Sequence, residues 1–166
     1  AREMDCSVAA VQETREHLIH LYGTISGKRV PGRSQVYSID DMLEKPNLSI
    51  AEYKLQVSGL RPGHYLCFFG MHVLMPRIFD ILDEHIRKGN RDNHEVQLTP
   101  ALRELARFEK YLALETCGRR FNIGVPYGYV EAQIALALAG KDREKILSNL
   151  VEILLQQEQS NHRCCS

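Results

Sequence analysis

The sequence predicts a single α/β domain, or a large part of one, because segments with strand character alternate along the chain with segments of helical periodicity. The chain has 166 residues, of which 44% are hydrophobic and 25% charged. This size is sufficient for one ordinary hydrophobic core and too small for two. We expect residues 1–157 to form the domain and the polar residues 158–166 to be disordered, since this tail has too little apolar surface to order itself.

The first half of the chain is predicted to be mainly β. Residues 6–12 form a short apolar run bounded by polar residues, as in a buried strand, and residues 13–20 form a polar helical turn. Glycine and proline in residues 22–33 predict turns between short strands, and residues 35–43 have the character of a further strand. Because the chain opens with a strand of central character, we expect one edge of that strand to be unpaired, which favours self-association.

The second half is predicted to be mainly helical. Pro76 opens a helix that ends at Gly89. A second helix covers residues 98–108, with Thr99 as its N-cap and Pro100 in its first turn. The elements expected after it are a strand over residues 111–116 and helices over residues 129–139 and 143–157. We expect the apolar stripe of the last helix to pack on the sheet, with a contact to a second subunit as the alternative.

The composition excludes several classes of protein. The 21 basic and 21 acidic residues cancel, so the chain lacks the positive charge with which proteins follow nucleic acid or bind anionic membranes. Its apolar runs are shorter than the roughly 20 residues needed to cross a bilayer, and its N-terminus lacks the pattern of a signal peptide. Five cysteines without metal-ligand spacing indicate reduced thiols. We therefore expect a cytoplasmic protein with no nucleic-acid or membrane partner.

Three short segments are the best candidates for a functional site. They are DMLEKP at residues 41–46, EVQLTP at residues 95–100 and FNIGVPYGYVEA at residues 121–132. In the first segment, Glu44 supplies a carboxylate that can accept hydrogen bonds from paired hydroxyls, and Lys45 supplies a compact positive charge for a phosphate. Taken alone, without the other two segments, the EKP tripeptide favours a solvated charged turn over a binding site.

The order and spacing of these segments resemble the second half of the bacterial UTP-glucose-1-phosphate uridylyltransferases, and the resemblance covers roughly residues 5–155. It implies the Rossmann-like three-layer fold of nucleotide-diphospho-sugar transferases, with the C-terminal part present and the N-terminal nucleotide-binding part absent. It also implies nucleotidyl transfer from UTP to glucose 1-phosphate, giving UDP-glucose and pyrophosphate, with this chain as the acceptor half. The chain alone is expected to be inactive. The alternative is a non-catalytic homologue that binds a sugar phosphate or has a regulatory role.

The resemblance also assigns roles to individual residues. Glu44 is expected to bind hexose hydroxyls, and Lys45 to bind and orient the attacking phosphate, which makes Lys45 the catalytic candidate. Gly23 and Gly70 are expected to let the backbone approach the sugar, although Gly23 is equally compatible with an ordinary turn. The family's magnesium-binding aspartate is replaced here by Asn122, whose neutral amide is a weaker ligand for Mg²⁺.

The ligands and partners follow from the same resemblance. Glucose 1-phosphate is the expected ligand, UTP is expected to bind only with the missing half, and Mg²⁺ is the expected cofactor. Homo-oligomerisation is a further expectation.

Overall fold

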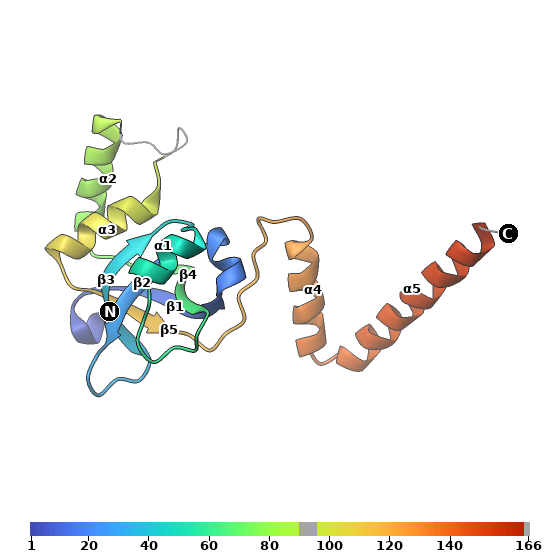
Figure 1. Ribbon diagram of the computed structural model, residues 1–166. Helices are drawn as coiled ribbons and strands as arrows, with labels where there is room; N and C mark the ends of the chain where they lie inside the picture. The colour runs from blue at the N-terminus through green and yellow to red at the C-terminus, as the bar shows by residue number, and fades with distance from the viewer. Residues whose placement is uncertain (90–95, 165–166) are drawn as a thin grey trace. The chain divides into compact units, whose positions relative to one another are not determined.

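The chain forms two compact units in a computed structural model that describes residues 1–89 and 96–164, with side chains described up to residue 157. The first unit, Ala1–Gly118, contains every strand of the described residues, and the second, Arg119–Ser166, contains the last two helices (Figure 1). The candidate residues for sugar and phosphate binding lie in the first unit, and Asn122 lies in the second.

Five strands of the first unit close into a barrel in the order β1-β4-β2-β3-β5. Their bounds are β1 Ser7–Arg15, β2 Thr24–Arg29, β3 Val36–Leu43, β4 His64–Val73 and β5 Tyr111–Glu115. Only β1 and β5 pair in parallel, and every other pair is antiparallel. The expected mixture of strands and helices is therefore present. The finer expectation of a Rossmann-like three-layer arrangement is not confirmed, because turns and short helices link most strands, whereas a parallel sheet needs helical crossovers.

The opening strand β1 is paired on both sides, with β4 on one side and β5 on the other. The expectation of an unpaired edge is therefore wrong for this strand, because barrel closure supplies the second neighbour. The strand also runs to Arg15, so it includes the start of the segment predicted to be a helical turn. That turn is the 3₁₀ helix η2, Glu16–Leu21.

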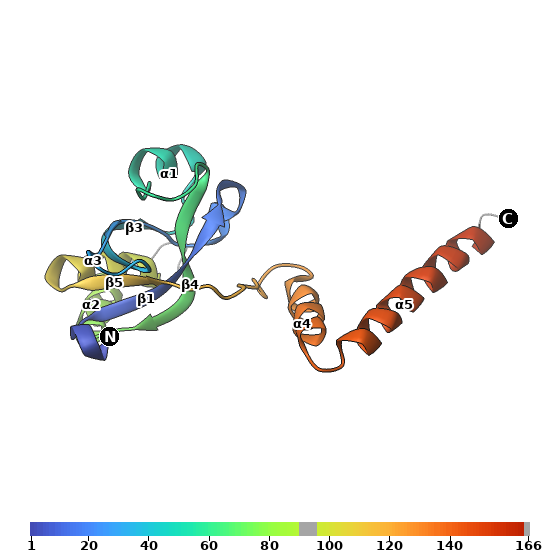
Figure 2. The same ribbon diagram turned by 90° about the horizontal axis from the view of Figure 1, so that it is seen from below.

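Three α-helices accompany the barrel. The predicted helices α2, Arg77–Lys88, and α3, Leu98–Phe108, are both confirmed, and Gly89 ends α2 in a left-handed conformation with φ 67°. Helix α1, Leu48–Lys54, was not predicted, and its N-cap Asn47 accepts a hydrogen bond from the backbone N–H of Ile50 at 2.9 Å. Figure 2 shows α1 apart from α2 and α3, in agreement with its contact with η2 and the contact of α3 with β3.

The main core lies inside the barrel and under α2 and α3. It includes Val11, Ile25, Tyr37 and Leu66 from the strands and Leu102 from α3. A second cluster under α1 includes Ile19, Ala51, Leu55, Tyr65 and Cys67. The two clusters together bury apolar side chains of the strands and of helices α1, α2 and α3.

The second unit consists of α4, Gly128–Ala139, and α5, Arg143–Cys164, which contact each other. Helix α5 continues beyond its predicted end and includes most of the polar tail. Large apolar side chains of α5, among them Leu147, Val151 and Leu154, are exposed.

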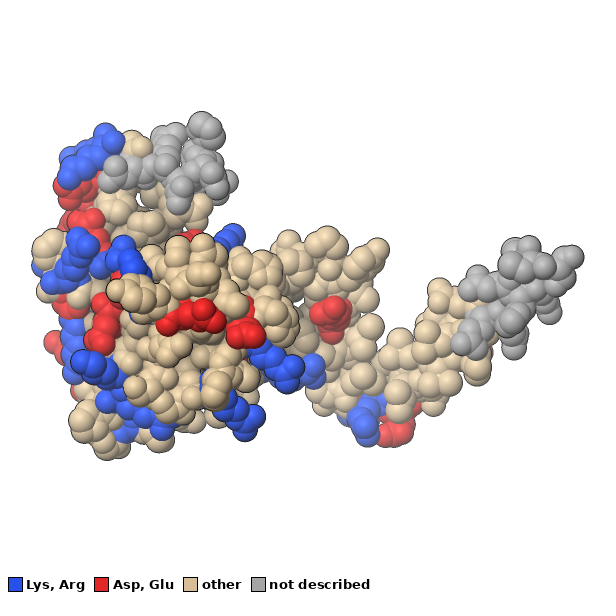
Figure 3. Space-filling model, in the orientation of Figure 1, with Lys and Arg blue, Asp and Glu red and all other residues tan. Residues whose placement is uncertain are grey.

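The described residues bear on three of the expectations drawn from composition. None of their helices is long and apolar enough to cross a membrane. Figure 3 shows both acidic and basic side chains on the visible face of the first unit, and the whole chain carries equal numbers of the two kinds. Cys6, Cys67 and Cys117 are free thiols, which agrees with the expectation of reduced cysteines.

Candidate functional site

The predicted segment DMLEKP lies beside Tyr22 and Gly23, where β3 ends and β2 begins. In the antiparallel pair of β2 and β3, Thr24 lies opposite Leu43. Gly23 immediately precedes β2 and Glu44 immediately follows β3, so the two residues lie at the same end of this strand pair. The backbone N–H of Lys45 donates a hydrogen bond to the carbonyl oxygen of Tyr22 at 3.2 Å. Strand pairing therefore brings together residues that are about twenty positions apart in the sequence.

Gly23 is buried, and close packing there leaves no room for a side chain. A Cβ atom at this position would lie 2.7 Å from Cδ2 of Phe68 and 3.0 Å from Oε2 of Glu44. The carbonyl oxygen of Gly23 accepts a hydrogen bond from the backbone N–H of Phe68 at 2.8 Å. A glycine is therefore required by the approach of Glu44 and Phe68 to the backbone, in addition to any role in a turn.

The Glu44 carboxylate is held on one side by helix α3. Thr99 donates a hydrogen bond from Oγ1 to Oε2 of Glu44 at 2.5 Å, and Thr99 is only 7% exposed. The prediction that Thr99 is the N-cap of α3 is wrong, because Gln97 occupies that position and no side chain caps the helix. Glu44 itself is exposed, so its carboxylate is accessible to a ligand.

Lys45 is exposed and has a left-handed backbone with φ 43°. Among the described residues its ammonium group forms no ion pair, either with the neighbouring Glu44 or with another carboxylate. The charges of Glu44 and Lys45 are thus both present at one end of the barrel without neutralising each other. This arrangement can accept hydrogen bonds from hydroxyls and bind a phosphate at adjacent positions.

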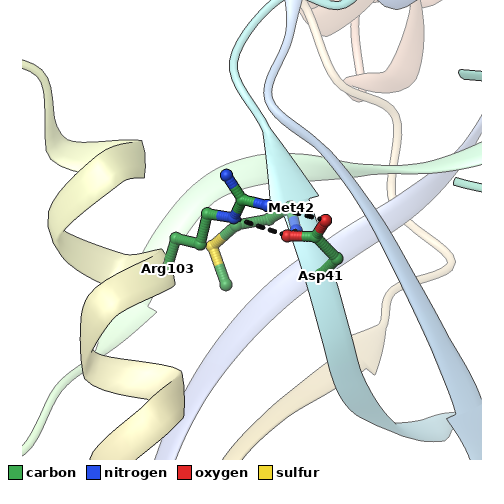
Figure 4. A network of polar contacts seen from close by, with 3 residues as sticks. All are labelled: Asp41, Met42 and Arg103. Atoms are coloured by element: carbon green, nitrogen blue, oxygen red, sulfur yellow. Dashed lines mark hydrogen bonds and ion pairs between the residues drawn. The ribbon is translucent and has the colours of Figure 1, made fainter. Parts of the chain in front are cut away.

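An ion pair that the sequence did not indicate links the same two elements. Arg103 of α3 donates to both carboxylate oxygens of Asp41 in β3, at 2.6 Å and 3.0 Å (Figure 4). The Asp41 oxygen at 2.6 Å also accepts a hydrogen bond from the backbone N–H of Met42 at 2.8 Å. Because the two members are 62 positions apart, only the folded structure could reveal this contact.

Gly70 occupies a bulge in β4, where residues 69–71 lie opposite Ala10. Its φ of 90° is a conformation that residues with side chains rarely adopt, but nothing lies within 4 Å of where its Cβ would be. The positive φ, rather than a close contact, therefore explains why residue 70 is a glycine. The described contacts do not join Gly70 to Glu44 or Lys45, so its role in sugar binding stays a prediction.

His72 and Tyr111 form a partly buried polar contact beyond this bulge. The Nδ1 atom of His72 lies 2.8 Å from the hydroxyl of Tyr111, and its ring meets the ring of Phe68 edge to face at 5.0 Å. Burial lowers the pKa of His72 and raises the pKa of Tyr111. Both shifts favour the neutral forms of the two side chains, and the His72 ring packs against Phe68.

Asn122 lies in the second unit, in a tight loop before α4. Its Oδ1 accepts a hydrogen bond from the backbone N–H of Gly124 at 3.1 Å. The backbone of Gly128 approaches Asn122 closely, since a Cβ at Gly128 would lie 1.9 Å from the carbonyl oxygen of Asn122. The single side-chain oxygen of Asn122, which carries no charge, therefore already accepts a hydrogen bond within its own loop.

The described residues do not by themselves fit a magnesium site. In the part of the chain that the structure describes, no three His, Cys, Asp or Glu side chains gather to hold a metal ion, whereas Mg²⁺ favours anionic oxygen ligands. Glu95, which begins the second sequence segment, lies outside the described residues.

Curated proteins with similar sequences share one description. UTP-glucose-1-phosphate uridylyltransferase 2 of Staphylococcus saprophyticus is 34% identical over 148 residues, which are 89% of this chain and 45% of that protein. The corresponding enzyme of Pseudomonas aeruginosa is 31% identical over 128 residues, 76% of this chain and 40% of that protein. The chain therefore spans less than half the length of these relatives. No family model matches the chain.

Solved structures give the same result. A UDP-glucose pyrophosphorylase complexed with UDP-glucose is 30% identical, with a TM-score of 0.65 over 84% of this chain and 47% of that chain. A UTP-bound enzyme from Acinetobacter baumannii, at 21% identity and a TM-score of 0.66, supports the fold alone. The chain is therefore homologous to the C-terminal half of the UTP-glucose-1-phosphate uridylyltransferases.

Proposed function

We propose that this chain carries the sugar 1-phosphate side of a uridylyltransferase site, with glucose 1-phosphate as the ligand. The observation that carries the proposal is the meeting of Gly23, Glu44 and Lys45 at one end of the barrel, with the two charges unpaired among the described residues. The homology to enzymes of this description supports the choice of ligand.

In this proposal each residue has a separate task. The carboxylate of Glu44 accepts hydrogen bonds from hydroxyls of the hexose, and the ammonium of Lys45 pairs with the phosphate. Lys45 thereby orients a phosphate oxygen for attack on the α-phosphorus of UTP, which releases pyrophosphate and forms UDP-glucose. Positioning and charge neutralisation supply the catalysis, and no covalent intermediate with the protein is required. Residues beyond this chain would hold the nucleotide.

A second candidate is a homologue that binds a sugar phosphate without catalysis. Asn122 favours it, because a neutral amide stands where the resemblance places an anionic metal ligand, and its oxygen already accepts a hydrogen bond from Gly124. Both candidates predict the same binding of glucose 1-phosphate. Pyrophosphate release from UTP would distinguish them only where a nucleotide-binding part is also supplied. From this chain alone we expect no release under either candidate, so turnover above background would contradict its assignment as an acceptor half.

The test of the proposal is a titration with glucose 1-phosphate, followed by ligand-observed NMR, on the wild type and on Lys45→Met. Loss of a charged contact to phosphate corresponds to roughly 1.5–3 kcal/mol, so we expect affinity to fall about ten- to a hundredfold. Glucose, which lacks the phosphate, should bind both proteins equally weakly.

The matched control is Lys28→Met, which removes an exposed lysine at the opposite end of β2 and should change nothing. Equal affinities of wild type and Lys45→Met for glucose 1-phosphate would show that Lys45 is only a solvated residue of the turn. An absence of binding by the wild type would refute the proposed function as a whole.

A further inference from the structure

We propose that Thr99 is a positioning residue that holds the Glu44 carboxylate in the orientation in which it receives sugar hydroxyls. The inference rests on the proposed function, in which Glu44 contacts the hexose. The hydrogen bond of 2.5 Å from Thr99 to Glu44 joins the second sequence segment to the first. The threonine of EVQLTP thereby acts through Glu44, without touching the ligand.

The two partners differ in burial, so we infer that Thr99 positions Glu44 and not the reverse. Thr99 is 7% exposed and begins a helix whose Ala101, Leu102 and Leu105 are completely or almost completely buried. Glu44 is exposed and follows the last residue of β3, so packing alone leaves its side chain several rotamers. A fixed donor therefore selects one rotamer of a mobile acceptor, as a pre-organised binding site requires.

The Asp41–Arg103 ion pair supports this arrangement from the same helix. Thr99 and Arg103 are four residues apart, so they lie on one face of α3, and Asp41 lies three residues before Glu44 at the end of β3 (Figure 4). The two hydrogen bonds of Arg103 to Asp41 fix both the distance and the orientation of β3 relative to α3. The Asp41–Arg103 ion pair therefore helps to set the distance between Thr99 and Glu44 independently of their own hydrogen bond.

The arrangement also predicts which part of the ligand is affected. Thr99 binds Oε2 of Glu44, and this oxygen also faces Gly23, so only Oε1 is left entirely to the ligand. Lys45 is not part of the contact. Loss of the Thr99 hydroxyl should therefore weaken recognition of the sugar and leave recognition of phosphate unchanged.

The experiment compares Thr99→Val, which keeps the shape and removes the donor, with Thr99→Ser, which keeps the donor. We expect Thr99→Val to bind glucose 1-phosphate about 5- to 20-fold more weakly than wild type and Thr99→Ser to stay within about twofold. Inorganic phosphate, titrated as a second probe, should bind wild type and Thr99→Val equally. Circular dichroism of each variant reports whether the fold is retained.

A double-mutant cycle with Glu44→Ala, which removes the acceptor of the Thr99 hydrogen bond, separates positioning from a merely structural role. If Thr99 acts through Glu44, Thr99→Val should change affinity by less than about twofold in the Glu44→Ala background. An equal loss in both backgrounds, or an equal loss for Thr99→Ser, overturns this inference alone. Failure of the wild type to bind glucose 1-phosphate overturns the proposed function and this inference together.

Discussion

Substitution of Gly23 by alanine should both destabilise the first unit and weaken ligand binding. The added Cβ would lie 2.7 Å from Cδ2 and 3.3 Å from Cε2 of Phe68, and 3.0 Å from Oε2 of Glu44. The shortest of these separations is well below the 3.4–4 Å of ordinary van der Waals contact. A side chain at residue 23 therefore requires both neighbours to move.

The magnitude follows from how little Phe68 can move. Its side chain is buried in the main core, its ring contacts His72, and its backbone N–H is bonded to Gly23 itself. Insertion of one carbon atom into such a packed site costs about 1–3 kcal/mol. Glu44 is exposed and can move more easily, but its displacement would break the contact with Thr99. We therefore expect a loss of about 1–3 kcal/mol in the free energy of unfolding, together with weaker binding of glucose 1-phosphate.

Urea unfolding followed by circular dichroism measures the first effect, and the NMR titration measures the second. Gly118→Ala is the matched control, because a Cβ there would lie 3.7 Å from Phe69, which is an ordinary contact. This control should change the free energy of unfolding by less than about 0.5 kcal/mol. A Gly23→Ala protein as stable as the control would refute the argument from close packing.

Two further predictions concern pH and metal ions. Burial raises the pKa of Tyr111 above its ordinary value. The stabilisation by its neutral hydroxyl should therefore be complete below about pH 10 and decrease as the pH rises further. In urea unfolding at a series of alkaline pH values, the free energy of unfolding should fall less for Tyr111→Phe than for wild type. Glucose 1-phosphate binding by this chain should be unchanged by EDTA, because Glu44 and Lys45 supply the contacts and the described residues form no cluster of metal ligands; a clear drop in affinity in the same titration after chelation would contradict this.

Local signals in the sequence predicted the helices well. Helix α3 has its predicted bounds, because a proline in the first turn and apolar residues at helical spacing specify it without reference to the rest of the chain. Helix α1 was missed because it is short and buries only Ala51, so it has no apolar periodicity. Strand β4 was missed because Gly70 and His72 interrupt its apolar run. Barrel closure depends on pairing between distant strands, which no local pattern encodes.

The candidate site was predictable to the same extent. The Glu44-Lys45 pair could be identified from its own chemistry and from the family resemblance, and Gly23 from the resemblance. The contact of Thr99 with Glu44 could not, since its partners are 55 positions apart and a threonine at the start of a helix is most simply an N-cap. The same holds for the ion pair of Asp41 with Arg103.

The left-handed backbone of Lys45 sets the stability of the protein against its proposed binding of phosphate. A residue with a Cβ at φ 43° is less stable than glycine by about 1 kcal/mol or more, and the hydrogen bond to Tyr22 holds the backbone in that conformation. We therefore expect Lys45→Gly to give a more stable protein that binds glucose 1-phosphate more weakly. Stabilisation of this chain by consensus or by directed evolution would tend to remove the very residue on which phosphate recognition is proposed to depend.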